Sequence, residues 1–252
     1  MKKEIWRAGN MLYPLPVVMV SCARSGEKPN IITLAWAGTV CTNPPMVSIS
    51  VRPERYSHDI IDKTGEFVIN LVTKDLVHAC DWCGVRSGRE HDKFAVCGLD
   101  AEKAREMSFA PLIRQSPVNL ECRVTQKIPL GSHDLFLARV VCVHVDGNGL
   151  DENGRYDLGR AGLVSYSHGE YFALGEKLGS FGYSVKKASA VAGKKADAAG
   201  GRKAGASAGK KTDAAGGRKA GASAGKSMGT ASGENGNHTG GRKGNRSKRR
   251  GI

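Results

Sequence analysis

The sequence predicts a mainly β domain over residues 1–185, followed by a basic tail of low complexity over residues 186–252. Two observations lead to this division. Short apolar, β-branched runs separated by Gly, Pro and Asn turns fill the first segment, and the composition changes abruptly after it. The runs are unevenly spaced, and helices interrupt them without regular alternation. This pattern favours an antiparallel barrel over a βαβ sheet.

The predicted strands are the segments rich in Val, Ile, Leu and Phe. They are Val17–Cys22, Ile31–Trp36, Met46–Val51, Phe67–Val72, Val118–Val124 and Leu135–Val145.

Two helices are predicted between these strands. Ser57 is the expected N-cap of "HDIIDKTG", with Asp59 in the first turn and Gly65 as the stop signal. The stretch "KDLVHACDW" predicts a second, short helix.

The charge of the chain is concentrated in the tail. Residues 186–252 contain 17 Lys and Arg against 3 Asp and Glu, whereas residues 1–185 contain 21 of each. Residues 194–209 recur with one substitution as residues 210–225, and large apolar side chains are almost absent after Val191. Such a segment cannot bury a core, so we expect it to be disordered.

The seven cysteines are scattered and odd in number, which fits a reducing, cytoplasmic environment better than a disulfide framework.

No apolar run approaches the roughly 20 residues that would span a bilayer. The N-terminal stretch up to Cys22 has some features of a lipoprotein signal. Glu4, two prolines and the short apolar core argue against that interpretation.

The segment "NIITLAWAGTVCTNPPMVSISVRPERYSH" (30–58) predicts two strands joined by a tight "NPP" turn. The second strand delivers Arg52 shortly before the expected helix start at Ser57. A guanidinium, a hydroxyl and free backbone N–H groups suit a phosphate. The alternative is a surface arginine beside an ordinary N-cap. In "AWAGT", small residues around Trp36 would let a planar ligand approach the backbone, unless Trp36 simply fills the core.

The stretch "CDWCGVRSGREHDKF" (80–94) contains a C-x-x-C pair. A structural zinc site needs four ligands, and no second pair follows at suitable spacing. A thioredoxin-like dithiol would lie at a helix start, whereas Cys80 and Cys83 come toward the end of a predicted helix. These features argue against a metal site or a redox dithiol in this stretch, and we expect no metal site.

Six motifs taken in order resemble the flavin reductase-like, or flavoredoxin, family of FMN-binding split-barrel proteins. They are "TLAWAGT", "SVRPERYS", "GEFVINL", "CGVRSGREHDKF", "GSHDLFLARV" and "SYSHGEYFALGEKLGSFGYS". The resemblance runs from about Trp6 to Ser184 and excludes the tail.

The resemblance implies a six-stranded antiparallel Greek-key split barrel, a homodimer, and one FMN per subunit. It also implies which residues bind the cofactor: Asn30, Thr33, Trp36, Ala37, Gly38 and Thr39 along the ring and ribityl chain, Ser50, Val51, Arg52 and Ser57 toward the phosphate, and Lys93 and His133. Lys93 would place positive charge near the N1–C2=O edge of the flavin. His168 and Tyr171 would border the substrate side or form a structural cover over the barrel.

The function implied is that of an FMN-dependent oxidoreductase, in which electrons pass from NAD(P)H through FMN to a redox protein or a small-molecule acceptor. No catalytic acid–base pair is expected. The alternative is an FMN electron carrier that does not use NAD(P)H directly. The tail suggests weak, non-specific polyanion binding, or simply a solvated segment without a partner.

Overall fold

The computed structural model of the chain describes residues 1–185. The predicted disorder of residues 186–252 lies outside the described residues. Within the described range, no helix is both long enough and apolar enough to cross a membrane.

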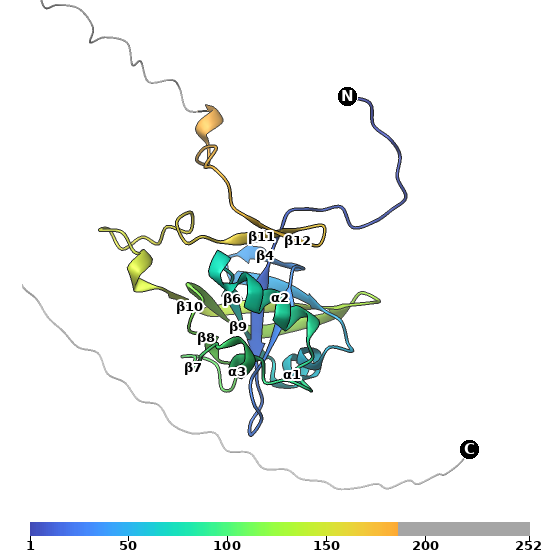
Figure 1. Cartoon of the computed structure of the whole chain (residues 1–252), viewed down its shortest axis with the longest axis vertical. Helices are drawn as coiled ribbons and strands as arrows, with labels where there is room; N and C mark the ends of the chain where they lie inside the picture. Colours follow the sequence, from blue (N-terminus) through green and yellow to red (C-terminus); the bar gives the residue numbers. More distant parts are fainter. Residues whose placement is uncertain (186–252) are drawn as a thin grey trace, which may run out of the picture. The chain divides into compact units, whose positions relative to one another are not determined.

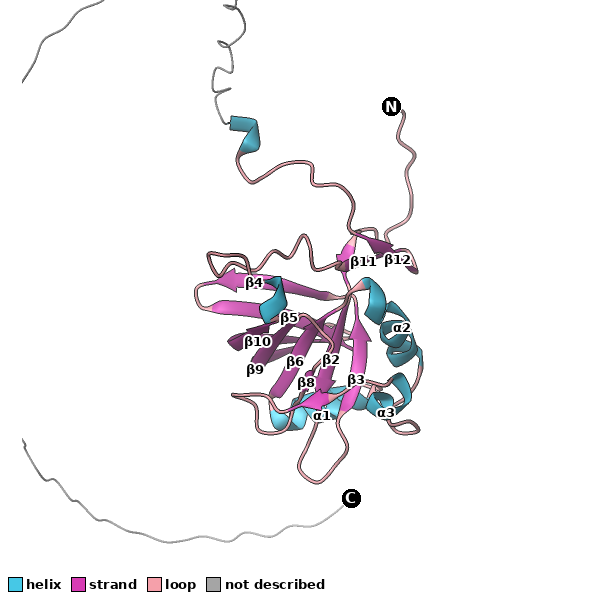
Figure 2. Ribbon diagram, turned by 60° about the vertical axis from the view of Figure 1, so that its left-hand side comes forward, coloured by secondary structure: helices cyan, strands magenta, loops and turns pink. Residues whose placement is uncertain are grey.

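The main sheet contains seven antiparallel strands in the order β3-β2-β6-β9-β10-β5-β4 and curls into a split barrel (Figures 1 and 2). Its strands are β2 (Val18–Cys22), β3 (Asn30–Leu34), β4 (Ala37–Thr42), β5 (Pro45–Val51), β6 (Glu66–Leu71), β9 (Val118–Pro129) and β10 (Asp134–Val145). The predicted mainly β fold is confirmed, and each predicted strand corresponds to an observed one.

Within the main sheet, the strand absent from the sequence prediction is β4. The predicted run that ends at Trp36 stops at Leu34 in the structure, and the chain then forms β4, which pairs with β5 across the Asn43–Pro44 turn. The predicted turn is therefore present, but it joins β4 to β5. The main sheet of the described residues therefore has seven strands, where the resemblance implied a six-stranded barrel.

Helices α1 (Tyr56–Thr64), α2 (Val77–Val85) and α3 (Lys93–Cys97) all contact β3. Helix α1 packs against the core inside the curled sheet, whereas α2 and α3 pack against its other face, beside β3 in Figure 2. The prediction that Ser57 caps α1 was wrong. Arg55 is the N-cap residue, with no side-chain capping bond, and Ser57 lies within the first turn. The predicted stop is confirmed, because Gly65 has φ 68° in the left-handed region.

The smaller elements complete the described part of the chain. A three-stranded sheet is formed by β1 (Leu15–Pro16), β11 (Val164–Ser167) and β12 (Glu170–Ala173), and a two-stranded one by β7 (Ala101–Glu102) and β8 (Leu112–Ile113). Short 3-10 turns occupy Lys74–Leu76, Gly147–Gly149 and Tyr183–Val185.

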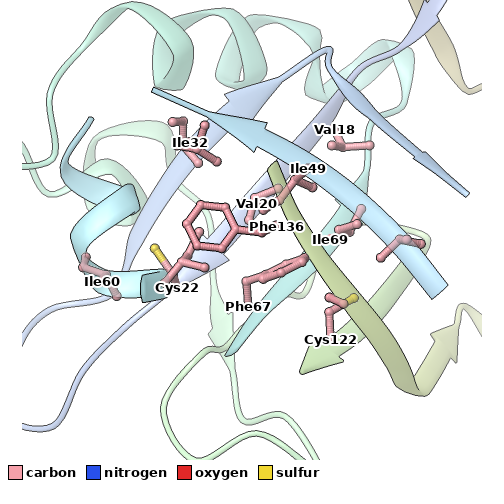
Figure 3. Close-up of a cluster of buried hydrophobic side chains, with 14 residues drawn as sticks. Val18, Val20, Cys22, Ile32, Ile49, Ile60, Phe67, Ile69, Cys122 and Phe136 are labelled. Atoms are coloured by element: carbon pink, nitrogen blue, oxygen red, sulfur yellow. The ribbon is translucent and has the colours of Figure 1, made fainter. Parts of the chain in front are cut away.

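The core fills the inside of the curled sheet. Phe67 and Phe136 are fully buried there together with the aliphatic side chains of β2 and β5 (Figure 3). Burial of each such side chain contributes about 1.5–3 kcal/mol. His58 of α1 hydrogen-bonds Asp134 at 2.8 Å, which fixes α1 to the start of β10. The packed interior gives β3 and β5 a rigid base for the site that they border.

Candidate functional site

Two adjoining cavities lie where β3, the end of β5 and helix α2 meet. The larger has a volume of about 370 Å³ and the smaller about 170 Å³. Ile32, Arg55 and Gly84 line both of them. The larger volume falls within the range of small-molecule sites in proteins.

Trp36 and His133 form one wall of the larger cavity. Their rings meet edge to face with centroids 4.7 Å apart. The indole is 43% exposed, so Trp36 does not fill the core. Its carbonyl accepts a 2.9 Å hydrogen bond from the backbone N–H of Ser50, which holds Trp36 beside the end of β5. A rigid aromatic surface of this kind suits a planar ligand.

The charge state of His133 is set by its surroundings. Partial burial lowers the pKa of His133 below its ordinary value, and the nearby positive charge of Arg52 lowers it further. The imidazole therefore remains neutral at neutral pH. Ser132 lies 2.9 Å from Nδ1 of the same ring.

Tyrosines form the opposite wall of the larger cavity. Tyr13, Tyr166 and Tyr171 all line it. The hydroxyl of Tyr171 donates a 2.9 Å hydrogen bond to Asp81 of α2, which links β12 to that helix. Burial, followed by this bond, raises the pKa of Tyr171. His168 stacks on Tyr13 with centroids 4.6 Å apart and does not itself line the cavity.

The smaller cavity is basic. Its lining includes the side chains of Arg55, Arg86, Arg89 and Lys93, with Glu54 as the acidic member. The guanidinium of Arg89 lies over the ring of Tyr56 at 5.1 Å from its centroid. Such a concentration of guanidinium groups at the first turn of α1 suits a phosphate or another compact anion.

Asn30 and Ser57 lie at the floor of the smaller cavity. The amide Nδ2 of Asn30 donates a 2.8 Å hydrogen bond to the hydroxyl oxygen of Ser57, and both residues are buried. Gly88 closes over the amide: a Cβ atom at this position would lie 2.1 Å from Oδ1 of Asn30. The glycine is therefore required by this close approach.

Lys93 lies in the same cavity, and its ammonium group is already engaged. Nζ donates hydrogen bonds of 2.7 Å to the carbonyls of Ile31 and Cys83, and the residue is only 3% exposed. Burial lowers the pKa of Lys93, and the neighbouring thiols partly offset that effect. The side chain thus ties β3 to α2 while contributing a cation to the basic cavity.

The structure brings most of the predicted site residues to these two cavities. The larger cavity is lined by Thr33, Trp36, Ser50, Arg52 and His133, and the smaller by Asn30, Ser57 and Lys93. Four predicted residues lie outside both: Val51, which is fully buried in the core, and Ala37, Gly38 and Thr39 on β4.

The residues that the sequence prediction missed are Arg55, Arg86, Arg89 and the cavity tyrosines Tyr13 and Tyr166. Arg86 and Arg89 belong to the "CGVRSGR" motif. The motif was identified from the sequence, but its arginines were not predicted to line the site. Tyr166 lies on β11 and Tyr13 lies in the segment that precedes β1. These segments are far apart in sequence, so no local sequence pattern predicts that the two side chains meet.

Cys80 and Cys83 lie within α2, and both are fully buried. Burial raises the pKa of each thiol to about 12. A buried thiol that stays protonated is a poor nucleophile. The sulfur of Cys83 lies 3.8 Å from that of Cys97 in α3.

The curled antiparallel sheet and the paired cavities at its edge define a split-barrel protein with a candidate ligand-binding site. The family model described as the flavin reductase like domain matches residues 10–175. The chain therefore belongs to the flavin reductase-like family.

Solved structures and curated relatives agree with this assignment. The flavoredoxin of Desulfovibrio vulgaris (Miyazaki F) is 30% identical, with a TM-score of 0.68 over 74% of this chain and 100% of that chain. The flavoredoxin of Methanosarcina acetivorans is 26% identical, with a TM-score of 0.67 over 73% of this chain and 100% of that one. An NADH-dependent FMN reductase of Streptomyces nodosus subsp. asukaensis is 29% identical over 57% of this chain and 75% of that protein. These similarities support a flavin-related oxidoreductase role.

Proposed function

We propose that the protein binds FMN across the two cavities and transfers electrons from NAD(P)H to an acceptor. The observation that carries the proposal is the direct adjacency of an aromatic cavity and a basic one. FMN has the same two parts, a planar ring system and a phosphate dianion joined by a short polyol.

The residues present fit this cofactor. Arg55, Arg86 and Arg89 offer guanidinium groups to the phosphate, and charge-assisted bonds of this type are the strongest that a protein makes to it. Thr33 and Ser50 line the larger cavity and offer hydroxyl groups to the polyol. Trp36 and the tyrosines offer apolar surface to the ring.

Bound FMN would supply the hydride and single-electron chemistry, as flavins do in other proteins. The task of the chain is to hold the ring and to keep water from one of its faces. His133 would present a neutral imidazole beside Trp36, because burial and Arg52 keep its pKa low. This site requires no catalytic acid–base pair from the chain.

A second candidate function is that of an FMN electron carrier, which exchanges electrons with a redox protein and does not oxidise NAD(P)H. The observation that favours it is the similarity to two flavoredoxins over nearly three quarters of the chain. We also propose a homodimer, from the family resemblance, and a cytoplasmic location, from the scattered cysteines. Sedimentation velocity would test the first.

The experiment begins with the purified full-length chain, titrated with FMN and with riboflavin. We expect one FMN per chain, with riboflavin bound more weakly because it lacks the phosphate that the basic cavity holds. Absence of FMN binding would overturn the proposal. Steady-state oxidation of NADH and NADPH by the FMN-loaded protein then separates the two functions. Stoichiometric FMN without turnover would favour the electron carrier.

A further inference from the structure

Three potential metal-binding side chains meet on strands β9 and β10, away from both cavities. They are Glu121, Cys142 and His144, whose ligand atoms all lie within 4.8 Å of one another. Figure 3 shows Cys122, the neighbour of Glu121, in the core cluster inside the sheet. Successive residues of a strand face opposite sides, so the side chain of Glu121 points away from that cluster.

A β-bulge creates this juxtaposition. Val140 pairs with Cys122, and the register then shifts so that Cys142, not Val141, stands opposite Glu121. His144 follows two residues later and pairs with Asn119 on the same face. Bulges of this kind re-aim side chains and are frequent beside functional sites.

The spacing of the ligand atoms fits a tetrahedral zinc ion. Nε2 of His144 lies 3.6 Å from Sγ of Cys142. Zinc bonds of about 2.3 Å to sulfur and 2.0–2.1 Å to nitrogen, at a tetrahedral angle, place those two atoms roughly 3.6 Å apart. Nε2 also hydrogen-bonds Oε1 of Glu121. Zinc would replace the shared proton and widen this contact to about 3.3 Å.

The carboxylate of Glu121 is held in place independently of the other two side chains. It is fully buried, and it accepts hydrogen bonds from the backbone N–H groups of Arg105 at 2.9 Å and Glu106 at 2.6 Å. Outer bonds of this type orient metal ligands.

Solvent can reach the cluster through His144, whose side chain is 32% exposed, and Cys142 is half-buried. Arg105, whose backbone N–H bonds Glu121, forms a 3.3 Å side-chain ion pair with Glu106, which reduces its repulsion of a bound metal. The cluster is therefore accessible to an ion from solution.

We propose that Glu121, Cys142 and His144 bind one zinc ion, with water in the fourth position. Within the part of the chain that the structure describes, no fourth His, Cys, Asp or Glu joins the group. One thiolate and one imidazole favour zinc over magnesium or calcium, which prefer oxygen ligands. Three protein ligands and one open position are the arrangement of exchangeable zinc sites.

The test uses the full-length chain, freed of metal under a thiol-free reductant. Zinc affinity is measured by competition with a chromophoric chelator, and the zinc environment by X-ray absorption, to which bound flavin is transparent. We expect one zinc ion per chain and one sulfur neighbour at about 2.3 Å. Cys142→Ser and His144→Gln should each weaken binding by at least about 10- to 100-fold, because loss of even an outer partner costs that much.

Cys41→Ser is the matched control, since Cys41 is also half-buried and lies on a strand outside the cluster. It should retain full zinc affinity and the sulfur neighbour. Zinc without a sulfur neighbour, or unchanged affinity in Cys142→Ser, would overturn the proposal. Glu121→Gln is not used, because it would also disturb the loop that the carboxylate holds.

Discussion

Asn30 and Ser57 are joined by a hydrogen bond of 2.8 Å, which connects the first residue of β3 to the first turn of α1 inside the basic cavity. Gly88 packs closely against the same amide. Three segments that are distant in sequence therefore position the floor of the proposed phosphate site.

Gly88→Ala should weaken FMN binding, because the added Cβ would lie 2.1 Å from Oδ1 of Asn30 and force the amide away from Ser57. Overpacking of this kind costs about 1–3 kcal/mol. Fluorescence titration with FMN measures the effect. Gly147→Ala is the control, since a Cβ there meets nothing within 4 Å. Equal FMN affinity in both variants would contradict the prediction.

Arg52→Ala should weaken FMN binding far more than it lowers the melting temperature. Arg52 lines the larger cavity and is half-exposed, with a single 3.4 Å contact to Glu54. Loss of a charge-assisted bond to the cofactor costs about 1.5–3 kcal/mol, or roughly 10- to 150-fold in affinity. Unchanged FMN affinity at the same melting temperature would identify Arg52 as an ordinary surface residue.

The same variant has a second readout that does not depend on the cofactor. The charge of Arg52 helps to lower the pKa of His133, so its removal should raise that pKa. NMR titration of the imidazole protons in flavin-free protein checks the direction.

Lys93→Met should destabilise the fold as well as weaken FMN binding. The substitution leaves the carbonyls of Ile31 and Cys83 without their 2.7 Å partner. Each unsatisfied buried carbonyl costs about 1–3 kcal/mol. Urea denaturation measures this loss, and redox titration of bound FMN tests the charge near N1 that the family resemblance implies. That role predicts a lower potential in the variant, and an unchanged or higher one would exclude it.

The strands were predictable because their β-branched runs are local and uninterrupted. β4 escaped prediction because "AWAGTVCT" contains a glycine and lies at the sheet edge, where most of its side chains are exposed or half-buried. The side chains of such an edge strand show no clear hydrophobic pattern, so the sequence does not predict the strand.

The site was predictable only in part, for a related reason. Ser57 has the chemistry of an N-cap, but its hydroxyl bonds Asn30, 27 residues earlier. Arg55 and Arg89 meet because α1 and α2 both pack on β3. Motif resemblance recovered residues within each motif, whereas the basic cavity is a property of how separate loops are assembled.

The four fully buried thiols, Cys22, Cys80, Cys83 and Cys122, should resist modification in the native protein. Burial raises the pKa of each to about 12. In metal-free protein, an aromatic disulfide reagent at pH 8 should therefore modify only the half-buried thiols, Cys41, Cys97 and Cys142, quickly. Rapid reaction of all seven thiols would contradict this expectation.

The same shifts predict a loss of stability in alkali. In the unfolded chain these thiols ionise near pH 8.5, whereas in the native protein they stay protonated until about pH 12. The native state then binds more protons, so the free energy of unfolding decreases as the pH rises above about 8.5. Urea titrations between pH 7 and pH 10 measure this, and Cys80→Ala should reduce the slope.

Residues 186–252 should bind polyanions weakly and without sequence preference. This prediction rests on their 17 basic and 3 acidic side chains, and the segment lies outside the described residues. If about 6–10 of these side chains engage phosphates, affinity should fall roughly 10³- to 10⁵-fold between 50 and 200 mM salt. Anisotropy titrations on duplexes of different sequence measure both properties.

A chain that ends at Val185 should lose this binding and keep its FMN stoichiometry, because residues 1–185 carry equal numbers of acidic and basic side chains. Salt-insensitive binding, or binding retained by the shortened chain, would exclude counterion release from the tail as the mechanism.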